Sequence, residues 1–253
     1  MLLLLPPSET KRPGGEPGSR LDLARLRFPE LTDARRTVLS AVHALARDHD
    51  SSVAALKLGP TQHHEVAKNR VLEASALLPA ADRYTGVLYD ALDAASLPAT
   101  ARAHLGRHAA VHSAILGPVG ALDGIPDYRL SHDSRLPGVR LRAVWAPAVA
   151  AALAAETGLV LDARSQGYVA LGPAPHGVWL EVVAEDAGGR RRALNHFNKH
   201  AKGQLARAVA LSGEAPATVA ELVEWGHAHG FRLESQPPAE SGAARVALVT
   251  SPH

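Results

Sequence analysis

Hydrophobic and polar positions along the chain follow patterns that predict both helices and strands. The opening residues 1–5 are almost all leucine, which predicts a buried strand. Between Leu31 and Arg47, apolar residues recur at every third or fourth position, so a helix is expected there with Thr32 as its cap. A second clear helix is predicted at 145–156, and the apolar run 159–161 predicts a strand after it.

Shorter elements are predicted in the middle and in the C-terminal third of the chain. Val178–Glu185 and Arg190–Phe197 flank the turn Asp186–Gly189, and this arrangement predicts a β-hairpin. Further strands are expected at 109–116, 231–233 and 246–249, and a further helix at 218–229. Because the sequence shows neither regular βαβ alternation nor an internal repeat, it favours a single α+β domain over residues 1–253, a mixed sheet with surrounding helices.

Residues 53–72 have the pattern of two short helices joined by a tight turn. We expect Gly59 to end the first helix and Thr61 to start the second. Helix-hairpin-helix elements hold DNA backbone at such a turn, because small residues let phosphates approach main-chain N–H groups. Gly59, Thr61 and His64 would then contact DNA; the alternative is an ordinary helical hairpin, whose sequence looks the same.

Polar residues follow the predicted first strand directly. Ser8, Glu9 and Lys11 stand just beyond it, and polar groups in that position commonly line a cleft. The alternative is a simple surface turn. The Gly/Pro-rich stretch at about 12–20 has no periodicity and is expected to be a mobile loop.

The densest basic segment runs from His196 to Arg207. If it is helical with Asn198 as its N-cap, helical spacing places three cations on one face: Lys199, Lys202 and Arg207. That basic face would be free to meet an anionic partner. The alternative is a solvated amphipathic helix with no partner.

Composition narrows the possible functions. The 253 residues contain no cysteine, which excludes disulfides, thiolate metal sites and thiol-based redox or nucleophilic chemistry. The formal net charge is only +2, so attraction to nucleic acid has to come from a local patch. The apolar start lacks a basic n-region and ends at Pro6, and no run is long enough to span a membrane, so we expect a cytoplasmic protein.

Seven segments stand in the order found in one known family. They are Leu5–Lys11, Tyr84–Tyr89, Ser113–Gly117, Tyr128–Leu130, Arg135–Gly138, Ser165–Tyr168 and the group Asn198, Lys199, Lys202, Gly203 and Arg207. Through them the chain resembles the YaaA family of bacterial peroxide stress proteins, especially its actinobacterial branch, over essentially its whole length. The resemblance implies an α+β domain with a helix-hairpin-helix-like element and a positively charged cleft, binding to double-stranded DNA, and a role in lowering free iron and limiting oxidative damage.

The sequence departs from the family pattern at two places. Gly120 and Ala121 stand where the family has Arg-Pro, and His132-Asp133 replace its Met-Gly. The first change removes a cation from the expected cleft. The second places an imidazole beside a carboxylate, which offers a group for proton transfer and suggests recruitment as an enzyme.

We expect the polar segments to converge on one pocket for an anionic ligand, since clefts gather polar groups from several loops. The candidate catalytic residues are Glu9, Lys11, Tyr84, Tyr128, Arg129, His132 and Lys199. The candidate ligand or DNA contacts are Ser8, Gly59, Thr61, His64, Arg135, Ser165, Tyr168, Asn198, Lys202 and Arg207. For Glu9 the alternative is a surface ion pair of little energetic value.

Three spaced histidines are a candidate metal site. His104, His108 and His112 have helical spacing that would suit zinc, but the strand predicted from residue 109 breaks that face. We therefore expect no metal site and no cofactor.

Two functions follow from these observations. The leading hypothesis is a cytoplasmic DNA-binding protein of the peroxide stress response that uses the 58–64 turn and the basic segment. The alternative is an enzyme of specialised metabolism that acts without cysteine on a small anionic substrate, such as a nucleotide or an amino-acid derivative. Iron handling through the histidines is a third, weaker hypothesis, and the sequence does not define the oligomeric state.

Overall fold

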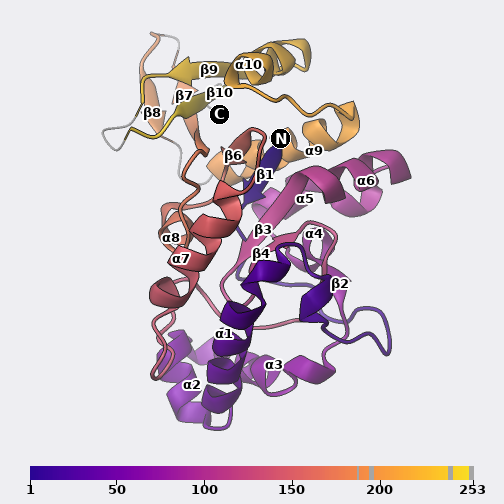
Figure 1. The fold of residues 1–253 in the computed structure, drawn as a ribbon, viewed down its shortest axis with the longest axis vertical. Helices are drawn as coiled ribbons and strands as arrows, with labels where there is room; N and C mark the ends of the chain where they lie inside the picture. Colours follow the sequence, from indigo (N-terminus) through magenta and orange to yellow (C-terminus); the bar gives the residue numbers. More distant parts are fainter. Residues whose placement is uncertain (187, 194–196, 239–241, 251–253) are drawn as a thin grey trace.

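A mixed β-sheet forms the centre of the molecule (Figure 1). The structure, a computed structural model, describes residues 1–186, 188–193, 197–238 and 242–250. Within these residues the eight-stranded sheet has the order β4-β3-β1-β6-β7-β10-β9, with β8 paired to β7. The strands are β1 (Leu2–Leu5), β3 (Ala109–Ser113), β4 (Gly117–Gly120), β6 (Val160–Asp162), β7 (Val178–Glu185), β8 (Arg191–Ala193), β9 (Arg232–Gln236) and β10 (Arg245–Thr250). A separate pair joins β2 (Leu78–Pro79) to β5 (Gly124–Ile125).

The inner strands of the sheet are parallel. β1 lies between β3 and β6 and is parallel to both, and β7 is parallel to β6 and β10. The antiparallel partners β4, β8 and β9 are added around this group. The molecule is therefore a single α/β domain with a mixed sheet: the predicted sheet and surrounding helices are confirmed, and the α+β class is wrong. The long insertion between β1 and β3 hides the alternation in the sequence.

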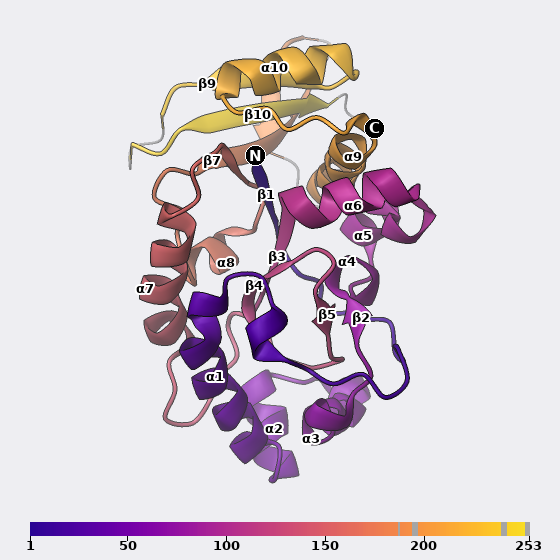
Figure 2. The ribbon, with the colours of Figure 1, turned by 45° about the vertical axis from the view of Figure 1, so that its right-hand side comes forward.

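Helices cover both faces of the sheet (Figures 1 and 2). α7 lies on one side, and α5, α6 and α9 lie on the other, while α1, α2 and α3 form one end of the long axis. Their bounds are α1 Thr32–Leu45, α2 His49–Leu56, α3 Val66–Arg70, α4 Ala80–Arg83, α5 Val87–Leu92, α6 Ala99–His108, α7 Leu141–Ala154, α8 Gln166–Ala170, α9 Phe197–Ser212 and α10 Val219–Ala228. None of the helices in the described ranges has the length and apolar character needed to cross a bilayer.

The leucine run at the N-terminus forms the central strand, as predicted. Leu2–Leu5 are fully buried because β1 has neighbours on both edges and helices over both faces. Pro6 and Pro7 lack the N–H groups that would continue the ladder, so the strand ends there. The residues that follow leave the sheet at the carboxyl end of β1. Ser8 and Glu9 therefore lie at the cleft described below.

The predicted helical hairpin at 53–72 is not supported. α2 begins earlier than expected, with the Asp48 carboxylate accepting from Ser51 N at 2.6 Å, and Lys57 rather than Gly59 takes the left-handed conformation after it. Pro60–Glu65 then forms a 3₁₀ helix before the short α3. The expected ends at Gly59 and Thr61 are therefore wrong by one or two residues, and the helix-hairpin-helix element is not confirmed.

Two predicted helix caps are also wrong, whereas the hairpin is confirmed. Thr32 is the first residue of α1, and its hydroxyl donates to Pro29 O. α9 begins at Phe197, so Asn198 lies inside the helix. β7 pairs with β8 as predicted, although residues 194–196 of the expected second strand and Ala187 of its turn lie outside the described residues.

The Gly/Pro-rich stretch 12–20 is hydrogen-bonded to the segment that leads to α4. Glu16 N donates to Leu77 O at 2.9 Å, and Arg12 N donates to Arg83 O at 2.7 Å. The buried Arg83 guanidinium in turn donates to Arg12 O and to Ile125 O. These contacts fix where the stretch lies, and its mobility stays a prediction.

A close helix–helix contact leads to a stability prediction. A Cβ at Gly203 on α9 would lie 2.1 Å from Leu88 O and 2.8 Å from Ala91 Cβ, both on α5. Because the backbone oxygen cannot move aside, Gly203→Ala should lower the free energy of unfolding by about 1–3 kcal/mol, measured by urea denaturation. Gly59→Ala is the matched control, since its Cβ would meet only Gln62 Oε1 at 3.8 Å. Equal stability of the two variants would contradict the prediction.

Candidate functional site

A cleft with a volume of about 920 Å³ opens at the carboxyl ends of β1 and β6. This is the edge of a parallel sheet at which ligands usually bind. Its lining comes from segments far apart in the sequence: Pro6–Thr10, Thr85–Tyr89, Ser131–His132, Arg164–Tyr168, Trp179–Val182, Asn198–Lys199 and Lys202. The fold therefore brings the strand-end loops and the first turns of α9 together around one space.

The structure divides the sequence-derived candidates into three groups. Those that line the cleft are Ser8, Glu9, His132, Ser165, Tyr168, Asn198, Lys199 and Lys202. Those that form a polar cluster behind the Ser8–Glu9 loop are Lys11, Tyr84, Tyr128 and Arg129. Those outside the cleft lining are Gly59, Thr61, His64, Arg135 and Arg207. Convergence on one pocket is thus observed for about half of the candidates.

The α9 side of the cleft has two polar groups without hydrogen-bond partners among the described residues. Lys202 is 5% exposed, and among the described residues none accepts a hydrogen bond from its ammonium. Its Nζ lies 5.5 Å from the centroid of the Trp179 ring, and burial lowers the pKa of Lys202 to about 8. One helical turn earlier, the buried Asn198 Oδ1 also has no hydrogen-bond partner in the described structure. Lys199 is exposed at the rim.

The predicted basic face of α9 does not exist as a free surface. Lys202 is buried against Trp179, and Arg207 donates to Leu92 O at 2.9 Å and Asp93 O at 2.8 Å. These carbonyls are at the end of α5, where helical carbonyl groups lack partners and attract a cation. Arg207 therefore joins two helices, and only Lys199 stays exposed.

The turn region predicted to bind DNA lies far from α9. Figures 1 and 2 show α2 and α3 at one end of the long axis, and α9 beside α5 and α6 toward the other end. Gly59, Thr61 and His64 belong to the segment between α2 and α3 and do not line the cleft. The two predicted DNA contacts therefore do not form one basic cleft.

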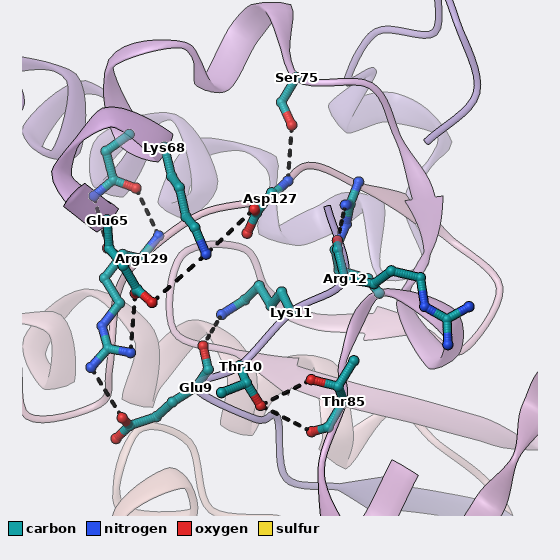
Figure 3. A network of polar contacts seen from close by, with 12 residues as sticks. Glu9, Thr10, Lys11, Arg12, Glu65, Lys68, Ser75, Thr85, Asp127 and Arg129 are labelled. Carbon is teal, nitrogen blue, oxygen red and sulfur yellow. Dashed lines mark hydrogen bonds and ion pairs between the residues drawn. The ribbon is translucent and has the colours of Figure 1, made fainter. Parts of the chain in front are cut away.

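An ion-pair network fixes the Glu9 carboxylate at the edge of the cleft (Figure 3). Arg129 is buried and pairs with Glu9 Oε2 at 3.0 Å and with Glu65 Oε2 at 3.3 Å. Lys68 Nζ lies 3.8 Å from Glu65 and 3.4 Å from Asp127. Because the Glu9 side chain is 64% exposed, the pair contributes little stability, and its effect is to orient the carboxylate.

Lys11 supports the same loop from behind (Figure 3). Its ammonium donates to Ser8 O and Glu9 O, both at 3.2 Å, and lies 4.2 Å from the centroid of the Tyr128 ring. Burial lowers the pKa of Lys11 to about 7, and Asp127 partly opposes this shift. The loop that delivers Glu9 is thus held by backbone contacts as well as by Arg129.

Three hydroxyl groups form a buried chain beneath Lys11. Tyr128 OH lies 2.7 Å from Tyr84 OH and 2.7 Å from Ser113 Oγ. Burial raises the pKa of both tyrosines well above the usual value, so the phenols stay neutral. These three hydroxyl groups lie outside the cleft lining, behind the segment that carries Glu9.

His132 and Asp133 point to different partners. His132 lines the cleft, with its ring 5.1 Å from that of Tyr168. Asp133 Oδ2 lies 2.6 Å from Lys57 Nζ, which lowers the pKa of this carboxyl group. The two residues therefore do not form the acid–base pair considered from the sequence, and only the imidazole reaches the cleft.

Sequence reasoning missed three parts of the site. Arg164 follows β6 and lines the cleft while its guanidinium binds the Asp162 carboxylate, and Trp179 on β7 covers Lys202. Arg164 had the same signal as Ser8, a polar residue directly after a buried strand. Glu65 and Lys68 had no such signal, because their role depends on a tertiary contact with Arg129 and Asp127.

The three spaced histidines do not share a face. His104 and His108 lie on α6, and His112 lies on β3, as the predicted strand requires. His104 Nε2 lies 2.9 Å from Glu214 O, and His108 Nδ1 lies 2.9 Å from Met1 O. Their ring nitrogens thus contact backbone carbonyl groups.

Comparisons with known proteins cover nearly the whole chain. The family described as peroxide stress protein YaaA matches residues 1–236. A UPF0246 protein of Corynebacterium efficiens is 41% identical over 239 residues, covering 92% of this chain and 95% of the relative. A UPF0246 protein of Streptomyces coelicolor is 42% identical over 252 residues, covering 96% and 95%. A UPF0246 protein of Lactobacillus delbrueckii subsp. bulgaricus is 30% identical over 177 residues.

Proposed function

Because the chain belongs to the YaaA family of peroxide stress proteins, we propose that it acts in the peroxide response by binding a small anionic molecule in the cleft. The observation that supports this proposal most is the Lys202 ammonium, which is buried at the cleft surface without an acceptor among the described residues. The Asp162 carboxylate attracts this ammonium without accepting a hydrogen bond from it, and a bound anion would supply an acceptor for the buried charge. The absence of cysteine excludes a thiol-based reaction with peroxide.

The polar groups that line the cleft also indicate which functional groups a ligand would carry. Lys202 and the exposed Lys199 suit a carboxylate or phosphate, and Asn198 Oδ1, which has no donor within the described ranges, suits a hydroxyl or amino group. A nucleotide or an amino-acid derivative carries both kinds of group. The oriented Glu9 carboxylate and the His132 imidazole supply groups that take or give a proton, so acid–base chemistry on such a substrate is the activity we propose.

Loss of the Lys202 ammonium should weaken ligand binding at least about tenfold, because a charge-assisted hydrogen bond contributes about 1.5–3 kcal/mol. The measurement is calorimetric titration of the purified protein with ATP, inorganic phosphate and glutamate. Lys202→Met is compared with Lys57→Met, which removes an exposed lysine whose partner Asp133 does not line the cleft. Equal affinities of the two variants, or no binding of any probe by the wild type, would reject the proposal.

DNA binding is a second candidate, favoured by the exposed Lys199 at the cleft rim. Because such contacts would be made to phosphates, the affinity for DNA should fall as the salt concentration rises and should not depend on the base sequence. A short DNA duplex titrated at two salt concentrations tests this, with Lys199→Ala as the variant. Binding that is absent, or that does not change with salt, would remove this candidate and leave the small-molecule proposal intact.

A further inference from the structure

Lys202 combines three properties that are rarely found in one lysine. It is buried, it lines a cleft that is open to solvent, and its amine donates to no acceptor in the described part of the chain. Most buried lysines instead direct the ammonium to a carboxylate or carbonyl group. The amine of Lys202 is therefore both desolvated and accessible to a molecule in the cleft.

Desolvation also makes the amine more reactive. With a pKa of about 8, about one tenth of the Lys202 side chains are neutral at pH 7. An amine with the ordinary value of 10.5 is neutral in only about one molecule in 3,000 under the same conditions. Since only the neutral amine has a free electron pair, burial against Trp179 increases the supply of nucleophile.

The second buried lysine, Lys11, lacks two of these three properties. Lys11 also has a lowered pKa, but its amine donates to two backbone carbonyl groups and lies outside the cleft lining. A substrate in the cleft would not reach it without moving the Ser8–Glu9 loop. Reactivity toward a ligand is therefore assigned to Lys202 alone of these two.

We propose that Lys202 is an amine nucleophile that forms an imine with a carbonyl compound bound in the cleft. The nitrogen electron pair forms a C–N bond as the carbonyl π bond breaks, and one proton passes from the nitrogen to the oxygen to give a carbinolamine. The second nitrogen proton is then transferred to the hydroxyl group as the C–O bond breaks, the C=N bond forms and one molecule of water leaves, so no oxidant or reductant is needed. Glu9, Glu181 and His132 line the same cleft and are groups that can move these protons.

The substrate class follows from the rest of the lining and rests on the proposed function. An aldehyde or ketone that also carries a carboxylate or phosphate would place its anionic group near Lys199 and its carbonyl carbon at Lys202. The imine, once protonated, withdraws electrons from the neighbouring carbon. Reactions that form or break a bond at that carbon are thus the class that this site would serve.

Borohydride trapping tests the imine directly. The full chain is incubated with glyoxylate or glyceraldehyde 3-phosphate, reduced with sodium borohydride and digested for peptide mass spectrometry. We expect Lys202 to be modified at least ten times faster than Lys199, which is exposed and lies less than one helical turn away. Equal labelling of the two lysines, or labelling of Lys199 alone, would overturn the proposal.

A conservative variant separates this proposal from the function on which it rests. Lys202→Arg keeps a cation for the anionic group but cannot form the imine, so it should bind phosphate or glutamate and lose labelling at this position. Wild-type protein that binds these anions but shows no preferred labelling of Lys202 would refute the imine and leave the anion site standing. Wild-type protein that is labelled at Lys202 but binds no anion would refute the proposed ligand class instead.

Discussion

Replacing Arg164 by methionine should lower the free energy of unfolding by about 3–5 kcal/mol. The guanidinium is fully buried and binds both oxygens of Asp162, at 2.8 and 2.5 Å. It also donates to Gly172 O at 2.8 Å and to the neutral His112 Nδ1 at 2.7 Å. Removal of the cation leaves a buried carboxylate and a buried carbonyl group without their donor, which costs more than the lost attraction alone.

Urea denaturation of matched variants tests this result. Arg36→Met is the control, because Arg36 pairs with Asp33 on the exposed surface of α1 and should contribute less than about 1 kcal/mol. The double variant Asp162→Leu/Arg164→Met should recover part of the loss, since the Asp162 carboxylate is then no longer left buried without the Arg164 cation. If Arg164→Met were no less stable than the control, the buried pair would not have the structural role assigned here.

Arg164→Met should also weaken ligand binding in the cleft. Arg164 lines it, and the following residues Ser165–Tyr168 form another part of its wall. Because the guanidinium holds the chain on both sides of this segment, at Asp162 and at Gly172, its loss should also weaken anion binding. Stability and ligand affinity are thus coupled at this residue, whereas Lys202→Met should change affinity with little effect on the fold.

Burial patterns made part of the fold predictable. The Leu2–Leu5 strand, the β7–β8 hairpin and the helices α7 and α10 follow from apolar runs or periodicity, because burial on one or two faces requires apolar residues at fixed intervals. Strand pairing was not predictable in this way. β1 pairs with β3, which begins at Ala109, and nothing in the intervening sequence records that contact.

The candidate site was predictable where a local rule applied. Ser8, Glu9 and Ser165 follow buried strands, and this rule placed them correctly at the cleft. Helical spacing correctly put Lys202 on α9 but gave no information on what covers it. Trp179 on β7 does so, and Arg207 is drawn to the end of α5, so the expected basic face was lost to tertiary contacts.

Raising the pH should stabilise the wild-type protein more than a Lys11→Met variant. In the folded protein burial lowers the pKa of Lys11 to about 7, whereas the unfolded chain has the ordinary value of 10.5. Between these two pKa values the unfolded state binds more protons than the folded state, so the free energy of unfolding rises with pH. Below about pH 7 Lys11 is charged in both states, and the folded state bears the whole free-energy cost of burying that charge. From about pH 7 to about pH 10 the gain specific to wild type should be about 3 kcal/mol.

Urea denaturation across that pH range gives the difference between wild type and variant, in which all shared titrations cancel. Lys202, whose pKa of about 8 acts in the same direction, is present in both proteins and does not affect the comparison. Two stability curves that run parallel from about pH 7 to about pH 10 would show that Lys11 stays charged. A widening gap would show that the loop carrying Glu9 is held by an amine that becomes neutral near physiological pH, so that the position of the cleft carboxylate depends on the buried network behind it.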